Sequence, residues 1–331
     1  MLDIRKLVLL REVEASGSIA AAAEALNYTR SAVSQQLSAL EAETGVALVD
    51  RGSRRACLTV AGRTLVEHTE RILERVEAAE AVLLAVTGGV SGELRVGVPF
   101  HEGPALLVPV LTRLQAQHPG LRITLHGVAA SEGREAVRLG RLDVVMAARY
   151  DQVPQNPVPG LHEEPLTDDR VRIAVAPDDV TAAGGGGPVG LGEFAHRPWI
   201  LDPESGLGRL ALHACAAAGF APDVVADTGD MHAALGLVSL GWGVALVPDL
   251  VPARPGYPVR RIPLAEPELI RRLSLVVRRG ALERPAVAAV LAAVRVATDT
   301  LEHGGGAAAQ PEDAVPEHAV PEDAVPEDAR R

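Results

Sequence analysis

The chain contains 331 residues, of which 47% are hydrophobic and only 2% are aromatic. This length accommodates two or three domains, whose cores must be built mainly from Val, Leu and Ala. The formal net charge of −11 speaks against a polyanionic partner, but residues 302–331 contribute −6 of it, with eight acidic residues against two arginines. Local charge governs such binding. We find no secretory signal and no apolar run of about 20 residues, so we expect a cytoplasmic protein that does not enter a membrane.

A short segment near the N-terminus predicts two helices joined by a tight turn. Ser18 is a favourable N-cap for a helix over residues 19–26, which is rich in Ala, the strongest helix former. Thr29 is a favourable N-cap for a second helix over residues 30–44, which Gly45 ends. Such a pair is typical of a helix-turn-helix, whose second helix enters the DNA major groove.

The second of these helices has one apolar and one polar face. Its apolar residues recur at helical spacing and are Val33, Leu37 and Leu40. On the polar face, arginine can read guanine, glutamine can read adenine, and serine can bond bases or phosphates. An ordinary amphipathic surface helix is also polar outside, so this pattern alone does not decide. The candidate DNA contacts of this segment are Ser18, Thr29, Arg30, Ser31, Ser34, Gln35 and Ser38.

An arginine-rich segment follows and strengthens the DNA-binding interpretation. Residues 51–63 hold four arginines and no acidic residue. Such a cluster suits contact with phosphates or the minor groove, although a solvated turn would look similar. Arg51, Arg54 and Arg55 are therefore further candidate DNA contacts. Two helices followed by a basic hairpin predict an all-α winged helix-turn-helix over residues 1–61.

A long helix without proline is predicted over residues 62–87. Two sets of mostly apolar residues recur every seven positions and form a heptad seam: Leu65, Ile72, Ala79 and Val86 with Thr69, Val76 and Leu83. The alternative is that this seam packs against the protein's own core. A helix-turn-helix that reads a two-fold site needs a dimer, and we therefore favour a linker and dimerisation helix over residues 62–88.

Strands and helices alternate over residues 92–301, which predicts a doubly wound α/β domain. Strands are expected at 93–98, 121–128, 143–148, 171–176, 199–201, 224–227, 244–247 and 273–277. Helices are expected at 103–117, 207–218, 231–240 and 285–301, with a further helix ending at Leu139.

The N-terminal segment resembles that of the LysR-type transcriptional regulators. The shared pattern comprises Ala22–Leu26, Thr29–Ser34, Leu40-Glu41, Gly45–Leu48 and Leu58–Gly62. Gly140–Val145 and Gly241–Pro248 extend the resemblance to about residue 300. The chain departs from the family at Arg30, where most members carry Gln, so we expect a base preference shifted toward guanine.

The resemblance implies a periplasmic-binding-protein-like effector domain of two subdomains over residues 92–301. It also implies the function of a transcriptional regulator that binds inverted repeats in promoters as a homodimer or homotetramer and responds to a small-molecule effector. RNA polymerase would be a further partner. The alternative is a ligand-binding protein, similar to solute-binding proteins, without a transcriptional role. It would require a secretion signal and would not need the basic hairpin.

The effector cleft is expected where the strands of the α/β domain end. Ligands of such domains bind beyond the carboxyl ends of strands, near helix N-termini, and the resemblance places chain crossings between subdomains near residues 149–165 and 263–268. Each candidate could equally be a loop residue without a ligand. The candidate effector contacts are Phe100, His101, Glu102, Ala129, Arg149, Asp202, Ser205, Met231 and Pro248.

Several other functions lack a pattern in the sequence. It contains no glycine-rich phosphate loop, no nucleophile elbow and no metal-spaced cluster, so we expect no enzymatic activity, no metal and no cofactor. Cys57 and Cys215 lie in different predicted domains and are interpreted as small buried residues rather than as a redox pair. Residues 302–331 repeat the motif PEDAV and predict a disordered acidic tail, which either competes with DNA for arginines or only aids solubility.

Overall fold

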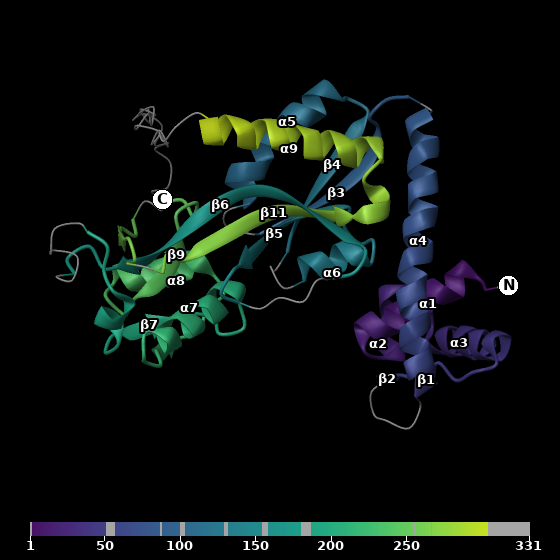
Figure 1. Ribbon diagram of the computed structural model, residues 1–331, viewed down its shortest axis with the longest axis horizontal. Coiled ribbons are helices and arrows are strands. Elements are labelled where there is room, and N and C mark those ends of the chain that lie inside the picture. The colour runs from purple at the N-terminus through teal and green to yellow at the C-terminus, as the bar shows by residue number, and fades with distance from the viewer. Residues whose placement is uncertain are drawn as a thin grey trace, which may run out of the picture.

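The computed structural model describes residues 2–50, 57–86, 88–99, 103–128, 132–153, 158–179, 187–253, 256–265 and 267–303. A small helical module at the N-terminus is joined by one long helix to a larger α/β domain (Figure 1). The predicted tail lies outside the described residues, except for its first two positions.

The N-terminal module, residues 2–58, consists of three helices and a short hairpin. The helices are α1 (Ile4–Ser16), α2 (Ile19–Ala25) and α3 (Arg30–Thr44), and the antiparallel hairpin pairs β1 (Val49–Asp50) with β2 (Cys57–Leu58). The apolar residues that close its core include Leu7, Leu10, Val13, Ala22, Val33, Leu37, Leu40 and Leu48. The predicted stripe on α3 therefore faces inward.

Local capping sets the ends of these helices. The Ser18 hydroxyl accepts a hydrogen bond from the Ala21 amide at 3.1 Å, and the Thr29 hydroxyl accepts one from the Ala32 amide at 3.2 Å. Gly45 ends α3 with a φ of 72°, a left-handed conformation that costs glycine little. These caps confirm the predicted bounds of α3.

The linker helix α4 (Val60–Val86) begins against the hairpin. A Cβ atom at Gly62 would overlap the carbonyl oxygen of Leu48, so glycine allows the close approach of α4 to the module. Thr69, predicted to lie on the dimer seam, is instead buried within the protomer, and its hydroxyl donates to the Leu65 carbonyl at 2.8 Å. The exposed apolar residues near the C-terminal end of α4 are Val82, Leu83, Leu84 and Val86.

Subdomain I (residues 92–170 and 270–303) contains one end of a seven-stranded mixed sheet. Its strands β3 (Gly92–Val98), β4 (Leu121–Gly127) and β5 (Val144–Tyr150) run parallel, and β11 (Ile270–Arg278) runs antiparallel beside β5. The helices of this subdomain are α5 (Gly103–Gln117), α6 (Gly133–Arg138) and α9 (Pro285–His303). In Figure 1, α6 lies between the sheet and the N-terminal half of α4.

Subdomain II (residues 171–269) continues the sheet from the far end of β6 (Leu161–Val175). There β9 (Ala245–Pro248) and β10 (Arg260–Ile262) pair with β6 in antiparallel fashion. A separate parallel pair consists of β7 (Pro198–Ile200) and β8 (Asp223–Ala226). The helices α7 (Gly206–Ala217) and α8 (Met231–Ser239) pack on these strands (Figure 1).

Two long strands, β6 and β11, connect the two subdomains. Leu166 and Leu273 belong to the core of subdomain I, whereas Val171 and Leu269 belong to that of subdomain II. The prediction that a strand begins at residue 171 was wrong, because β6 begins ten residues earlier and itself forms the crossing. Two of its acidic residues, Asp168 and Asp169, form ion pairs with Arg272 and Arg271 of β11, which lies beside it.

Candidate DNA-binding surface and effector cleft

The outer face of α3 carries most of the predicted DNA contacts. Arg30, Ser31, Gln35 and Ser38 are exposed, and Ser34 is half-buried. Because the opposite face of α3 is held in the core, these side chains are presented together on one rigid helix. The hydroxyl oxygens of Thr29 and Ser31 lie 3.1 Å apart at its N-terminus. Ser18 and Thr29 are N-caps in this structure.

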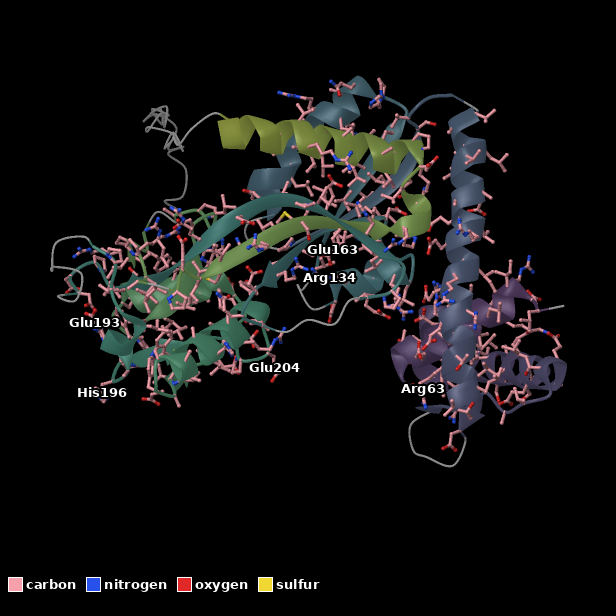
Figure 2. The ribbon with its side chains drawn as sticks, in the orientation of Figure 1. Arg63, Arg134, Glu163, Glu193, His196 and Glu204 are labelled. Carbon is pink, nitrogen blue, oxygen red and sulfur yellow. The ribbon has the colours of Figure 1, made fainter. Side chains whose placement is uncertain are left out.

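The hairpin β1–β2 lies in the position of a wing. Its predicted DNA contacts Arg51, Arg54 and Arg55 lie outside the described residues. At its base, Arg63 of α4 is exposed, and its Nη1 donates to the Leu58 carbonyl at 2.7 Å (Figure 2). A cation is thus fixed beside the hairpin.

A cleft of about 1020 Å³ separates the two subdomains. Its wall in subdomain I includes Pro99, Val128, Arg134, Glu135, Ala148 and Tyr150. Its wall in subdomain II includes Ile200, Leu201, Asp202, Ser205, Gly206, Thr228, Asp230, Met231 and Leu246. Most of these residues follow strand ends or begin helices, as the rule for α/β domains predicts.

Three of the predicted effector contacts line this cleft, namely Asp202, Ser205 and Met231. Arg149 and Pro248 lie outside its lining. The side chain of Arg149 is exposed on β5 opposite Arg272, and Pro248 is buried in β9 opposite a residue of β6. The remaining predicted contacts, Phe100, His101, Glu102 and Ala129, lie outside the described residues.

The N-termini of α7 and α8 face the cleft. The Ser205 hydroxyl accepts from the Gly208 amide at 2.9 Å and donates to the carbonyl of Asp202 at 2.8 Å. The Asp230 carboxylate caps α8 and accepts from the His232 amide at 2.8 Å. Side chains at this wall therefore hold the loops that shape the cleft, and also present polar atoms to it.

Two arginines of the cleft were missed by sequence reasoning. Arg271 is 3% exposed and Asp169 is 1% exposed, and the guanidinium Nε of Arg271 lies 3.1 Å from the carboxylate. Burial raises the pKa of Asp169, which shows the cost of desolvating this ion pair. No local pattern marks Arg271, because its position in the cleft depends on the pairing of β11 with β6.

Arg134 lies in the first turn of the short helix α6. Its Nε donates to Glu163 at 3.0 Å and its Nη1 donates to the Ala148 carbonyl at 3.4 Å (Figure 2). Its Nη2 is buried and has no hydrogen-bond partner within the described part of the chain. A helix expected to end at Leu139 was the only sequence feature that could have indicated this position.

Other kinds of site find little support in the described residues. Within them, no group of three His, Cys, Asp or Glu residues is arranged to hold a metal ion. Burial raises the pKa of Cys215 to about 12, in agreement with its interpretation as a buried structural residue. None of the described helices has the length and apolar character needed to cross a membrane.

Comparison with known proteins identifies the family. The model of the LysR substrate binding domain matches residues 87–298, and that of the bacterial regulatory helix-turn-helix protein, lysR family, matches residues 4–63. The chain belongs to the LysR family of transcriptional regulators. The predicted family and fold class are confirmed, and the chain is a DNA-binding regulator with a substrate-binding domain. The alternative of a ligand-binding protein without a transcriptional role is not favoured.

Several LysR-family regulators are similar to this chain. The transcriptional regulator ClcR of Pseudomonas putida is 29% identical over 76% of this chain and 84% of its own length. TfdS of Cupriavidus pinatubonensis is 31% identical over the same shares. MetR of Salmonella typhimurium is 32% identical over 55% of each chain. These relatives are transcriptional regulators rather than enzymes.

Two solved structures share the fold of the full chain. A full-length OxyR variant from Pseudomonas aeruginosa has a TM-score of 0.61 at 19% identity and covers 89% of this chain and 95% of its own. Full-length BenM has a TM-score of 0.56 at 22% identity and covers 92% and 98%. The module, linker helix and two-subdomain domain therefore form a known architecture.

Proposed function

We propose that this protein binds an inverted repeat in a promoter through α3 and the hairpin, and that a small molecule in the cleft alters this binding. The observation that carries the proposal is the outer face of α3, where Arg30, Ser31 and Gln35 are exposed beside a basic hairpin. The proposed divisions are residues 1–61, 62–88, 92–301 and 302–331. The proposed location is the cytoplasm, without cofactor or enzymatic activity.

Each DNA contact has a proposed role. Arg30 reads guanine, Gln35 reads adenine, and Ser31, Ser34 and Ser38 bond bases or phosphates. Ser18 and Thr29 add phosphate contacts at helix N-termini. Arg51, Arg54 and Arg55 bind phosphates or the minor groove independently of sequence.

The proposed effector contacts of the cleft are Asp202, Ser205 and Met231, joined by the missed residues Arg134 and Arg271. Phe100, His101, Glu102 and Ala129 complete the proposed set, because they follow the lining residues Pro99 and Val128 in the chain. A ligand that touches both walls would favour one relative placement of the two subdomains.

The oligomer is the expected form on DNA, since an inverted repeat presents two identical half-sites. The exposed apolar residues at the end of α4 offer a surface for a second copy, because water otherwise contacts Val82, Leu83 and Val86. A homodimer or homotetramer, with RNA polymerase as a further partner at the promoter, completes the proposal.

The test is a binding titration on DNA from the protein's own upstream region, with random DNA as competitor and with salt varied. We compare the wild type with Arg30→Ala and with Arg113→Ala, a matched variant of an exposed arginine on α5. Loss of a bidentate base contact lowers affinity by roughly 1–3 kcal/mol and relaxes sequence preference at one base pair. Arg113→Ala should bind like the wild type.

Specific, salt-sensitive binding that is weakened only by Arg30→Ala supports the proposal. Absence of specific binding at low salt would refute it. Equal weakening on operator and random DNA would show that Arg30 contacts phosphates and does not read a base.

A further inference from the structure

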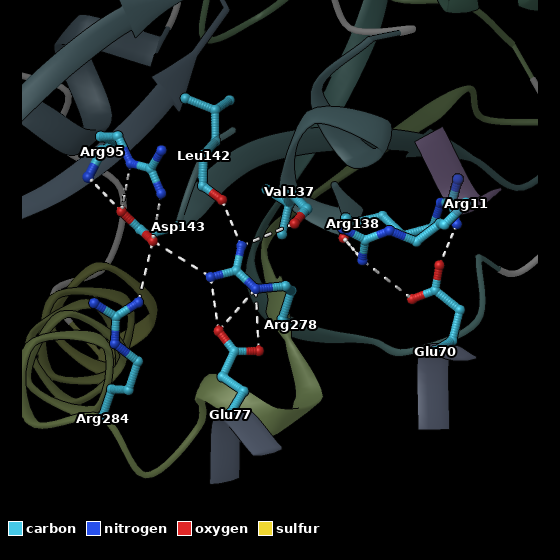
Figure 3. Close-up of polar contacts among 10 residues, drawn as sticks. All are labelled: Arg11, Glu70, Glu77, Arg95, Val137, Arg138, Leu142, Asp143, Arg278 and Arg284. Carbon is cyan, nitrogen blue, oxygen red and sulfur yellow. Dashed lines mark hydrogen bonds and ion pairs between the residues drawn. The ribbon is translucent and has the colours of Figure 1, made fainter. Parts of the chain in front are cut away.

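The short helix α6 extends from the effector cleft to the DNA-binding module. Its first turn contributes Arg134 and Glu135 to the cleft lining. Its last residue, Arg138, forms an ion pair with Glu135 of the same helix. It forms a second ion pair with Glu70 of α4 (Figure 3). One guanidinium thus joins a carboxylate of the cleft to a carboxylate of the linker helix.

Helix α1 of the DNA-binding module contacts the same end of α6. Arg11 donates to the carbonyl of Arg138 at 3.3 Å, and its Nη1 lies 3.7 Å from the Glu70 carboxylate. Arg141, just after α6, forms an ion pair with Glu12 of α1. Side chains of α1 therefore bond to groups at and just after the end of α6, and these contacts hold the DNA-binding module against subdomain I.

A second set of polar contacts between subdomain I and α4 lies further along this helix. Arg278 at the end of β11 pairs with Glu77 at 2.8 Å and donates to the carbonyls of Val137 and Leu142, at 2.9 and 2.7 Å, which flank the end of α6 (Figure 3). A Cβ atom at Gly280 would lie 2.5 Å from the carbonyl oxygen of α4 residue 74, so the two backbones approach closely there. Movement of α6 must therefore displace groups bonded to α4.

The junction of α6 with α1 and α4, formed by Arg138, Arg11 and Glu70, is buried, but not every polar atom in it has a hydrogen-bond partner among the described residues. The side chains of Arg138 and Glu70 are 11% and 12% exposed. Burial lowers the pKa of Arg138, but Glu135 and Glu70 more than offset this effect and hold it above its usual value. Arg11 Nε is buried without a hydrogen-bond partner in the described residues, and burial lowers the pKa of Arg11. Buried polar contacts of this kind favour discrete rather than graded arrangements.

We propose that α6 is the relay through which the effector cleft and the DNA-binding module of one protomer influence each other. A ligand group that binds the Glu135 carboxylate changes the strength of the Glu135–Arg138 ion pair, and with it the strength of the Arg138–Glu70 ion pair. The contacts of α6 with α1 and α4 change as a result. Because coupling of binding free energies is reciprocal, DNA on the module must also affect α6. This inference rests on the proposed function, since it assigns the route of its regulation.

The test is hydrogen–deuterium exchange on the full-length protein without DNA or effector. Glu135→Gln removes the carboxylate at the cleft, where its side chain is 41% exposed, so the core is left intact. Glu163→Gln is the matched control, because Glu163 pairs with Arg134 on the same helix but does not reach the junction. We expect Glu135→Gln to speed exchange of α1 amides roughly fivefold or more, with α3 as an unchanged internal reference and Glu163→Gln like the wild type.

A second arm adds the upstream DNA duplex. In the wild type, DNA should alter exchange at residues 136–142, and Glu70→Gln should abolish this difference while DNA is still bound. The relay is overturned if Glu135→Gln leaves α1 exchange unchanged, if Glu163→Gln has the same effect, or if the DNA-induced change persists in Glu70→Gln. If the wild-type protein shows no specific DNA binding, the proposed function is refuted instead. The exchange measurement without DNA still tests whether α6 is the relay.

Discussion

The buried ion pair at the subdomain crossing offers a sharp test of how the effector domain is held together. Asp169 of β6 accepts from Arg271 of β11 and, through its other oxygen, from the Leu250 amide at 3.1 Å. Asp169→Asn keeps an acceptor for that amide but removes the charge beside a guanidinium that is 3% exposed. Breaking a buried pair by removing one partner costs about 3–5 kcal/mol.

Removing both charges together should have the opposite effect on stability from removing one of them. Replacing a buried ion pair by uncharged side chains of similar size is often neutral or stabilising, because desolvation offsets the attraction. We therefore expect Asp169→Asn with Arg271→Met to be more stable than Asp169→Asn alone. The raised pKa of Asp169, caused by burial, agrees with this sign, since it reflects the cost of keeping the carboxylate charged.

Urea unfolding followed by tryptophan fluorescence measures both effects. Trp199 is fully buried in subdomain II, so its emission reports unfolding on one side of the crossing. A loss of about 3–5 kcal/mol in the free energy of unfolding lowers the urea concentration at the unfolding midpoint by roughly 1–2 M. The reasoning is refuted if Asp169→Asn unfolds at the wild-type urea concentration, or if the double variant is less stable than the single one.

Two further predictions concern the packing of the module and of subdomain II. Gly62→Ala forces α4 away from the Leu48 carbonyl and should cost about 1–3 kcal/mol, measured by thermal unfolding. Gly192→Ala, whose Cβ would meet nothing within 4 Å, is the neutral control. Cys215, whose pKa burial raises to about 12, should resist alkylation at pH 8 in a Cys57→Ser variant until urea is added. Rapid labelling of the native variant would contradict this.

Features that depend on neighbouring residues could be predicted from the sequence. The ends of α3 follow from Thr29 and Gly45, which act within a few positions of themselves. The rule that ligands bind beyond strand ends likewise led to Asp202 and Ser205, because each belongs to a loop between a strand and a helix.

Features that depend on distant pairing could not be predicted. The first ten residues of β6 look like a charged loop, and only the partners on β11 make them a strand. Arg271 reaches the cleft for the same reason. Thr69 fits a heptad seam by spacing, but it is buried because α1 packs on that side of α4 within the protomer.

The acidic residues of α4 bear on the two roles proposed for the linker helix, assembly and contact with the effector domain. Glu70, Glu74 and Glu77 recur at spacings of four and three, which places them on one face of the helix. From the sequence, such charges would be a solvated surface, but in the structure Glu70 and Glu77 meet Arg138 and Arg278 of subdomain I. The exposed apolar residues near the end of α4 remain available to a second copy of the chain. The proposed assembly surface and the proposed route to the effector domain therefore use different parts of one helix, so a substitution such as Glu70→Gln should alter the second without removing the first.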